Sequence, residues 1–147
     1  MLYTEPPATQ PADRDQALEA ICNVLLRRYG VVFREVLARE SILPPWRELL
    51  GMLRRLEGRG EVRGGRFVTD FLGEQFALPI AVESLRAMRR ESTMGERVAV
   101  AAADPLNLAG IIVPGDRVAA NSGTFVTFRD GAVAEDSRPI TELSAAL

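Results

Sequence analysis

The sequence contains no histidine, no lysine and only one cysteine. Without an imidazole, catalytic triads and dyads built on histidine are excluded, and so are most transition-metal sites. Without lysine, the chain has neither the amine of a P-loop nor one for Schiff-base chemistry. Cys22 cannot form an internal disulfide, and its apolar neighbours predict a core residue. We therefore expect neither a cofactor nor a metal ion in this chain.

Long apolar runs are also missing. No stretch of about 18 consecutive apolar residues exists, so we expect no membrane span and no membrane partner. The first residues lack the charged and apolar regions of a signal peptide, and a cytoplasmic, nucleoid-associated location is expected. Hydrophobic residues make up 47% of the 147 positions, enough for a packed core in one ordinary domain or two small ones.

Charge is segregated along the chain, although the net charge is only −2. Residues 1–20 carry one arginine and four acids, a net charge of −3. Residues 21–68 carry ten arginines and five glutamates, a net charge of +5. Residues 69–147 carry seven arginines and eleven acids, a net charge of −4. The basic segment favours a polyanionic partner. Because every basic residue of the whole chain is arginine, the number of arginines alone does not identify that partner.

Helical patterns dominate the first half. Asp13 or Asp15 is a candidate N-cap for a helix reaching Arg28, with Ala17, Ile21, Val24 and Leu25 on one face. Gly30 ends this helix. A very short strand at 31–32 and a short helix over 33–40 follow.

The clearest helix lies within 43–60. Pro45 suits its first turn, Gly58 and Gly60 suit its end, and an apolar stripe is formed by Trp46, Leu49, Leu50, Leu53 and Leu56. Residues 61–68 then predict a two-residue β-hairpin, because Gly64 and Gly65 permit the positive φ values of such a turn. Helix, strand, helix, helix and hairpin in this order are typical of a winged helix, whose third helix enters a DNA groove.

The pattern changes after a further helix expected over 79–90. From Glu96, short β-branched segments are separated by DP, PGD, NSG and RDG turns, which predicts a small antiparallel β-barrel or meander. The fold class is therefore α+β. We expect a linker or the edge of a cloned segment over 1–12, a winged-helix domain over 13–72, a connecting segment with its helix over 73–95, and the β domain with a loose C-terminal tail over 96–147.

Arginines gather on the two elements that winged helices present to DNA. The candidate nucleic-acid-binding residues are Arg47, Arg54, Arg55, Arg59, Arg63 and Arg66. Guanidinium groups bind phosphates in a bidentate manner and add affinity that does not depend on base sequence. Interspersed glutamates at 48, 57 and 61 compete for the same arginines. A solvated or domain-packing face is the alternative interpretation.

Other candidates have a structural interpretation that we favour. Trp46 is a potential base-stacking platform, but its place on the apolar stripe favours core packing. Phe67 and Phe71 are open to the same two interpretations, and core packing is again the favoured one. Asp104 and Asn107 in DPLNLAG are a potential acid and amide pair for base chemistry, but Asp-Pro and Asn are typical of a turn. No paired carboxylates or metal ligands are evident, and no catalytic residue is assigned.

In combination and order, four segments resemble the extreme C-terminal region of bacterial large helicase-related (Lhr) proteins. These segments are YGVVFREVLARE (29–40), LPPWRELLGMLRRLEGRGEVRGGRFV (43–68), GEQFALP (73–79) and ADPLNLAGII (103–112). The resemblance implies the last winged helix plus the β-barrel of a DNA-repair helicase, present as a fragment or a stand-alone tail. ATPase motifs are absent from this chain. Similar tails have been associated with DNA deglycosylation, but the glycosylase Gln-x-Asp motif has no match, since Gln75 is followed by Phe76 and Ala77.

The resulting hypothesis is a non-catalytic accessory module that contacts DNA backbone for a superfamily 2 repair helicase. Its partners would be single- or double-stranded DNA and the remaining helicase domains. Two alternatives stay open: an oligomerisation or interdomain scaffold that does not touch DNA, with a homo-oligomer as its form, and part of a glycosylase-like domain that removes uracil or alkylated bases.

Overall fold

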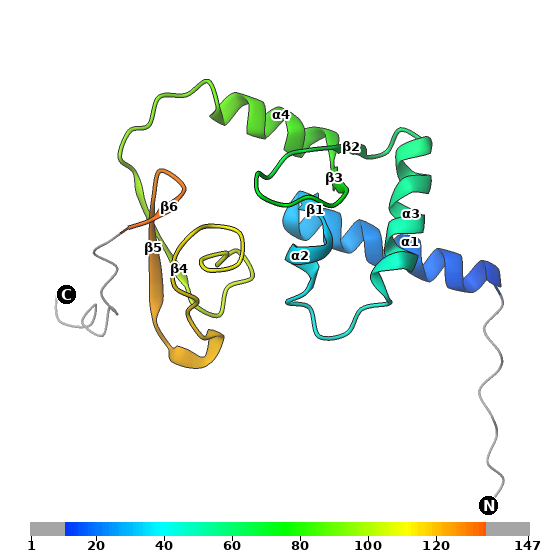
Figure 1. Ribbon diagram of the computed structural model, residues 1–147, viewed down its shortest axis with the longest axis horizontal. Helices are drawn as coiled ribbons and strands as arrows, with labels where there is room; N and C mark the ends of the chain where they lie inside the picture. Colours follow the sequence, from blue (N-terminus) through cyan, green and yellow to red (C-terminus); the bar gives the residue numbers. More distant parts are fainter. Residues whose placement is uncertain (1–10, 135–147) are drawn as a thin grey trace, which may run out of the picture. The chain divides into compact units, whose positions relative to one another are not determined.

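A computed structural model describes residues 11–134 of the chain (Figure 1). The described residues divide into two compact units, one ending at Ala87 and the other beginning at Met88. Each unit contains its own three-stranded antiparallel sheet. No helix within 11–134 is both long and apolar enough to cross a bilayer. The architecture is α+β, as the sequence predicts.

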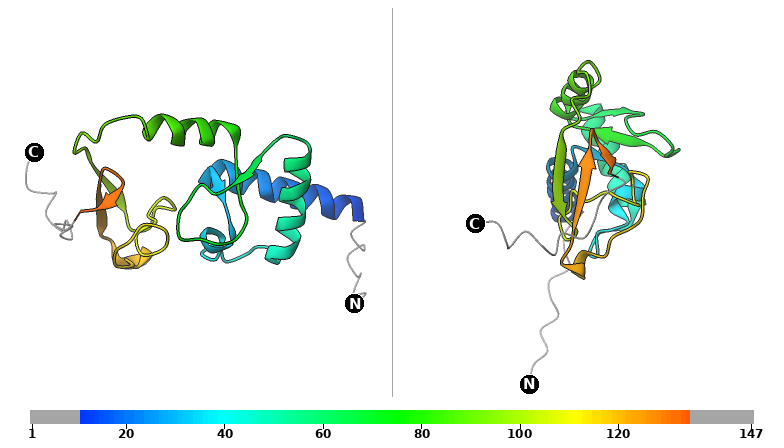
Figure 2. Two further views of the ribbon diagram at one scale, coloured as in Figure 1. Left: turned by 45° about the horizontal axis from the view of Figure 1, so that its top comes forward. Right: turned by 90° about the vertical axis from the view of Figure 1, so that its left-hand side faces the viewer.

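The first unit has the element order of a winged helix. Its elements are α1 (Pro11–Tyr29), β1 (Val31–Val32), α2 (Arg34–Leu37), α3 (Trp46–Gly58), β2 (Arg63–Gly65), β3 (Gln75–Ala77) and α4 (Pro79–Met88). The sheet order is β1-β3-β2, so the strand after the third helix pairs with one that lies ten residues further along the chain. The loop between β2 and β3, residues 66–74, is the wing, drawn in green in Figure 2.

Helix α1 packs through a different face from the one expected. It begins at Pro11, and its buried residues are Leu18, Cys22, Leu25 and Leu26, whereas Val24 is 54% exposed. Leu25 is the one buried residue that belongs to the predicted face. Gly30 ends the helix with a φ of +72°, as expected. Burial raises the pKa of the Cys22 thiol to about 11, so it is protonated and unreactive at neutral pH.

Helix α3 supplies the centre of the core. Leu49, Met52, Leu53 and Leu56 are buried. Met52 is buried in place of Leu50, which the expected stripe included and which is half-buried. Trp46, at the first position of the helix, is also half-buried. Gly60, with a φ of +78°, follows the last turn as predicted. The strong amphipathic pattern of this segment explains why its bounds could be predicted closely.

The predicted two-residue hairpin is wrong. Gly64 and Gly65 lie inside β2, opposite Phe76 and Gln75 of β3. A Cβ at Gly64 would collide with the carboxylate of Glu57, which accepts a hydrogen bond from the Gly64 N–H at 3.1 Å. A Cβ at Gly65 would lie 2.9 Å from Cζ of Phe67. The two glycines therefore leave room for the side chains of Glu57 and Phe67 close to the strand, and they do not form a turn.

The second unit is a meander. Strands β4 (Arg97–Ala101), β5 (Phe125–Arg129) and β6 (Ala132–Val133) form an antiparallel sheet in the order β4-β5-β6, and a short 3-10 helix, η1 (Ala120–Ser122), precedes β5. Within the described part of this unit the sheet does not close into a barrel, which corrects one of the two expected forms. Helix α4 ends at Met88 instead of Arg90. The expected C-terminal tail lies largely outside the described residues.

Candidate nucleic-acid interface

The exposed face of α3 carries two arginines and two glycines. Arg47, Gly51, Arg54 and Gly58 recur at helical spacing on the side opposite the buried residues of this helix, and all four are exposed. Nothing lies within 4 Å of a Cβ built at Gly51 or Gly58. A glycine inside a helix costs about 1 kcal/mol relative to alanine. The backbone of α3 is consequently open to a close approach on the side that displays Arg47 and Arg54.

A bidentate ion pair joins this face to the wing. Arg54 donates from Nε to Oε1 of Glu74 at 3.0 Å and from Nη2 to Oε2 at 2.5 Å. The hydrogen bonds from Arg54 lower the pKa of the Glu74 carboxyl. Both side chains are about half exposed, so the pair adds little to stability. In the structure the pair connects Glu74, the last residue of the wing, to the exposed face of α3.

Two of the candidate arginines turn toward α1. Arg55 donates to both carboxylate oxygens of Asp15 at 2.9 and 3.2 Å, and Arg59 donates to Glu19 at 2.6 Å. Arg59 also forms an ion pair with Glu61 at 2.7 Å. Asp15, a candidate cap from the sequence, instead pairs across to α3. The structure therefore gives Arg55 and Arg59 a role in joining two helices.

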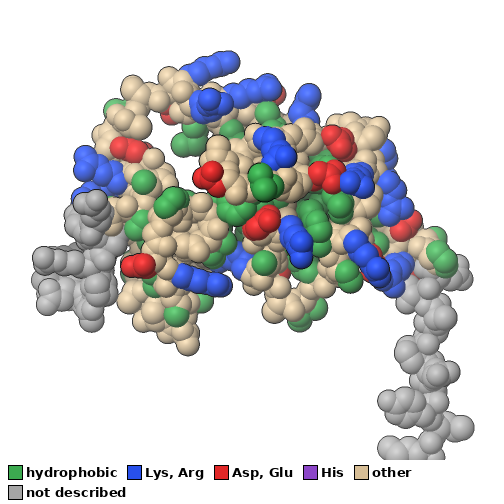
Figure 3. All heavy atoms as spheres, in the orientation of Figure 1, with side chains coloured by type: hydrophobic (Ala, Val, Ile, Leu, Met, Phe, Trp, Pro, Cys, Tyr) green, Lys and Arg blue, Asp and Glu red, His purple; other side chains and the backbone are tan. Residues whose placement is uncertain are grey.

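The remaining candidates, Arg47, Arg63 and Arg66, make no polar contact with α1 among the described residues that would remove them from the surface. Arg66 donates to the carbonyl oxygen of Phe71 within the wing at 3.0 Å. Arg47 and Arg63 are exposed and form no ion pair with any residue in the described range 11–134. Arginine and acidic side chains lie next to one another on the visible face of this unit (Figure 3). Four of the candidate arginines thus form no ion pair with α1 within residues 11–134. We call them the outer arginines: Arg47, Arg54, Arg63 and Arg66.

Gln75 holds the wing in shape. Its side chain is 1% exposed, and Oε1 accepts hydrogen bonds from the backbone N–H groups of Phe67 and Val68 at 2.9 and 2.8 Å. Its Nε2 donates to the carbonyl oxygens of Val68 and Phe71 at 2.8 and 3.3 Å. All the polar capacity of this buried amide is used on one loop. Sequence reasoning considered Gln75 only as a remnant of a catalytic motif and missed this role.

The fold of the first unit agrees with a comparison to known families. A family model described as the winged-helix domain of large helicase-related proteins matches residues 11–97, which is more than half of the chain. The chain belongs to this family. The match covers the first unit and reaches the first residue of β4.

One relative is described as "Lhr helicase/uracil glycosylase" from Escherichia coli (strain K12). It is 29% identical over 108 residues, an alignment that covers 71% of this chain and 7% of the relative. The chain thus corresponds to a small part of that protein. The sequence-based resemblance to the large helicase-related family is confirmed.

The segment DPLNLAG of this family member forms a turn. Oδ1 of Asp104 accepts a hydrogen bond from the N–H of Leu106 at 2.8 Å. Asn107 is buried, and its Nδ2 donates to the carbonyl oxygen of Ala102 at 3.2 Å. Both side chains are engaged locally, as the favoured interpretation predicts. Within the described residues, no group of acids, cysteines or histidines is arranged to hold a metal ion.

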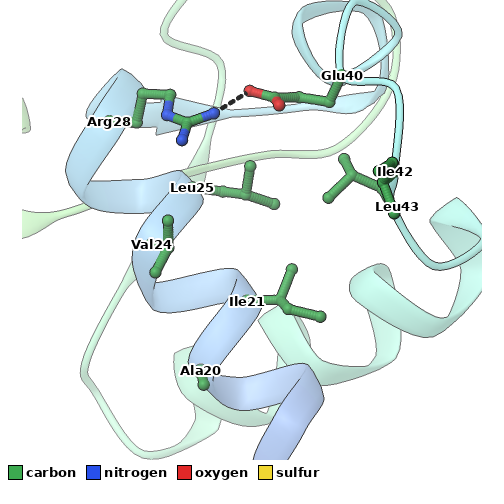
Figure 4. A pocket seen from close by; sticks show the side chains of 8 residues that line it. All are labelled: Ala20, Ile21, Val24, Leu25, Arg28, Glu40, Ile42 and Leu43. Carbon is green, nitrogen blue, oxygen red and sulfur yellow. Dashed lines mark hydrogen bonds and ion pairs between the residues drawn. The ribbon is translucent and has the colours of Figure 1, made fainter.

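The winged-helix unit also has an apolar pocket of about 310 Å³ between α1 and the segment before α3 (Figure 4). The pocket is lined by Ala20, Ile21, Val24, Leu25, Arg28, Glu40, Ile42 and Leu43. Glu40 is its one carboxylate; it accepts hydrogen bonds from Tyr29 and Arg28, each at 2.6 Å, which lower its pKa. A carboxylate held in its ionised form suits an ion pair at the rim and is a poor proton donor.

Proposed function

We propose that this chain is a non-catalytic module of a large helicase-related protein and that its winged helix holds the DNA backbone. The observation that carries the proposal is the placement of Arg47 on the exposed face of α3 and of Arg63 in β2, both exposed and without an ion pair among the described residues. Arg54, which is paired with Glu74, and Arg66 in the wing extend this set. Winged helices present these two elements to a duplex. In this proposal the arginines contact phosphates, and such contacts position a protein on DNA without reading base sequence.

The family, and the Escherichia coli relative described as a helicase, support a helicase as the whole to which the module belongs. The same description contains uracil glycosylase. We do not extend base removal to this chain, because Glu40 is the single acid in its pocket and is paired with Arg28. The surface that supports a function best is the one formed by the outer arginines.

Fluorescence anisotropy with labelled single- and double-stranded oligonucleotides tests the proposal. With two to four phosphate contacts, we expect the affinity to fall roughly 10- to 100-fold between about 50 and 200 mM salt. Absence of binding at the lower salt concentration would contradict DNA contact. If light scattering then found a stable oligomer, the scaffold interpretation would replace it.

A further inference from the structure

Leu72 lies in the C-terminal half of the wing and is exposed to solvent. Its side chain is 87% exposed, whereas the preceding residue, Phe71, packs against buried Phe33 with ring centroids 4.9 Å apart. Two consecutive large apolar side chains thus point in different directions, one into the core and one away from it. A single exposed leucine is common on protein surfaces and needs no explanation by itself. The loop that carries Leu72 is what sets it apart.

The backbone around Leu72 is fixed from both sides. The Gln75 side chain accepts hydrogen bonds from the N–H groups of Phe67 and Val68 and donates to the carbonyls of Val68 and Phe71. Arg66 donates to the Phe71 carbonyl as well. Asp70 adopts a φ of +69°, a left-handed conformation that aspartate tolerates in turns. The exposure of Leu72 is therefore built into an ordered loop, and contact with a partner would require little loss of conformational entropy.

The position of Leu72 ties it to the outer arginines. Glu74, two residues further along, is held by Arg54 on the exposed face of α3. Arg66 is bonded to the carbonyl group that immediately precedes Leu72. Leu72 therefore lies between a residue held by Arg66 and a residue held by Arg54. Two acids lie within two residues of it: Glu74, which is paired with Arg54, and Asp70, which has no ion pair among the described residues.

We propose that Leu72 is an apolar wedge that enters DNA between stacked bases while the outer arginines hold the backbone. Proteins that bend or open a duplex insert leucine, isoleucine, methionine or phenylalanine in this manner, and the cost of unstacking is offset by a larger wrapped surface. The inference rests on the proposed DNA contact and adds a local distortion of the helix to it. A module of this kind would loosen base stacking at the point where it holds DNA.

Two readouts on the same 147-residue chain separate the two proposals. Anisotropy reports whether DNA binds, and the fluorescence of 2-aminopurine placed at successive positions of a short duplex reports unstacking. The wild type is expected to raise the 2-aminopurine signal about twofold or more at saturation. Leu72→Ser is expected to lose this rise while its Kd stays within about threefold of the wild type, because the phosphate contacts remain. Leu72→Met is expected to restore the rise.

Ile42→Ser is the matched control. Ile42 is 91% exposed but lies at the apolar pocket, so this variant is expected to bind and to unstack DNA as the wild type does. Binding without a 2-aminopurine rise in the wild type, or an unchanged rise in Leu72→Ser, overturns the wedge and leaves the backbone contact standing. No anisotropy change at low salt overturns both. A change of oligomeric state in Leu72→Ser, with unchanged DNA signals, would show that the leucine contacts protein instead.

Discussion

Replacing Gln75 with leucine is expected to lower the free energy of unfolding by about 2–4 kcal/mol. Leucine has a similar volume and suits a buried site, so the loss comes from hydrogen bonding rather than from a cavity. The variant leaves the N–H groups of Phe67 and Val68 and the carbonyl of Val68 without the side-chain partner they have in the native loop, and the Phe71 carbonyl keeps only Arg66. Denaturant unfolding monitored by circular dichroism measures the effect.

The adjacent Glu74→Gln variant is the control for this experiment. Glu74 is about half exposed in its ion pair with Arg54, so its replacement is expected to change stability by less than about 1 kcal/mol. Hydrogen exchange of the Phe67 and Val68 amides should accelerate at least about tenfold in Gln75→Leu, because local opening no longer breaks those bonds. A loss of stability no greater than that of Glu74→Gln would contradict the view that Gln75 organises the wing.

Reversing the charge of two outer arginines is expected to abolish most DNA binding. In the double variant Arg47→Glu and Arg63→Glu, two phosphate contacts become repulsive, and the Kd at low salt should rise by about 100-fold or more. Both side chains are exposed and have no ion pair within the described residues, so the melting temperature should hardly change. Anisotropy and a thermal melt on the same samples measure the two effects.

A control with the same net charge separates local contact from general attraction. Arg27 on α1 and Arg86 on α4 are exposed, and Arg27→Glu with Arg86→Glu changes the net charge by the same amount. We expect this variant to bind within about fivefold of the wild type, because long-range charge is screened beyond about 10 Å at 0.1 M salt. Equal losses in the two double variants would mean that net charge, not the outer arginines, governs binding.

The sequence predicts the winged helix well where local signals are strong. Helix α3 combines a proline immediately before its first turn, an amphipathic stripe and glycines at its end, and its bounds follow from these features. The wing is different. Two adjacent glycines predict a tight turn by local rules, but in the structure they form a strand that accommodates Glu57 and Phe67. Their partner strand lies across a nine-residue loop, and that pairing leaves no local pattern.

The sequence locates the candidate site on α3 and β2, but it does not show which arginines of these elements remain available for a partner. Arginines gather on α3 and β2, yet Arg55 and Arg59 are neutralised by Asp15 and Glu19, each 40 residues away. One signal was present: both the acids and the arginines are spaced four residues apart, as paired helix faces require. The acidic first segment is thus the electrostatic complement of part of the basic one. Gln75 left no such signal, because a buried amide cannot be told from an exposed one by sequence alone.

The central claim is that α3 and the wing hold DNA, and nuclear magnetic resonance tests it most directly. Unlabelled duplex would be added to nitrogen-15-labelled chain at low salt, and the amide signals of the two units compared. We predict that the shifts concentrate at Gly51 and Gly58, whose signals are well separated from most others, and at residues 63–75. Shifts confined to β4, β5 and β6, or no shifts at all, would contradict the claim.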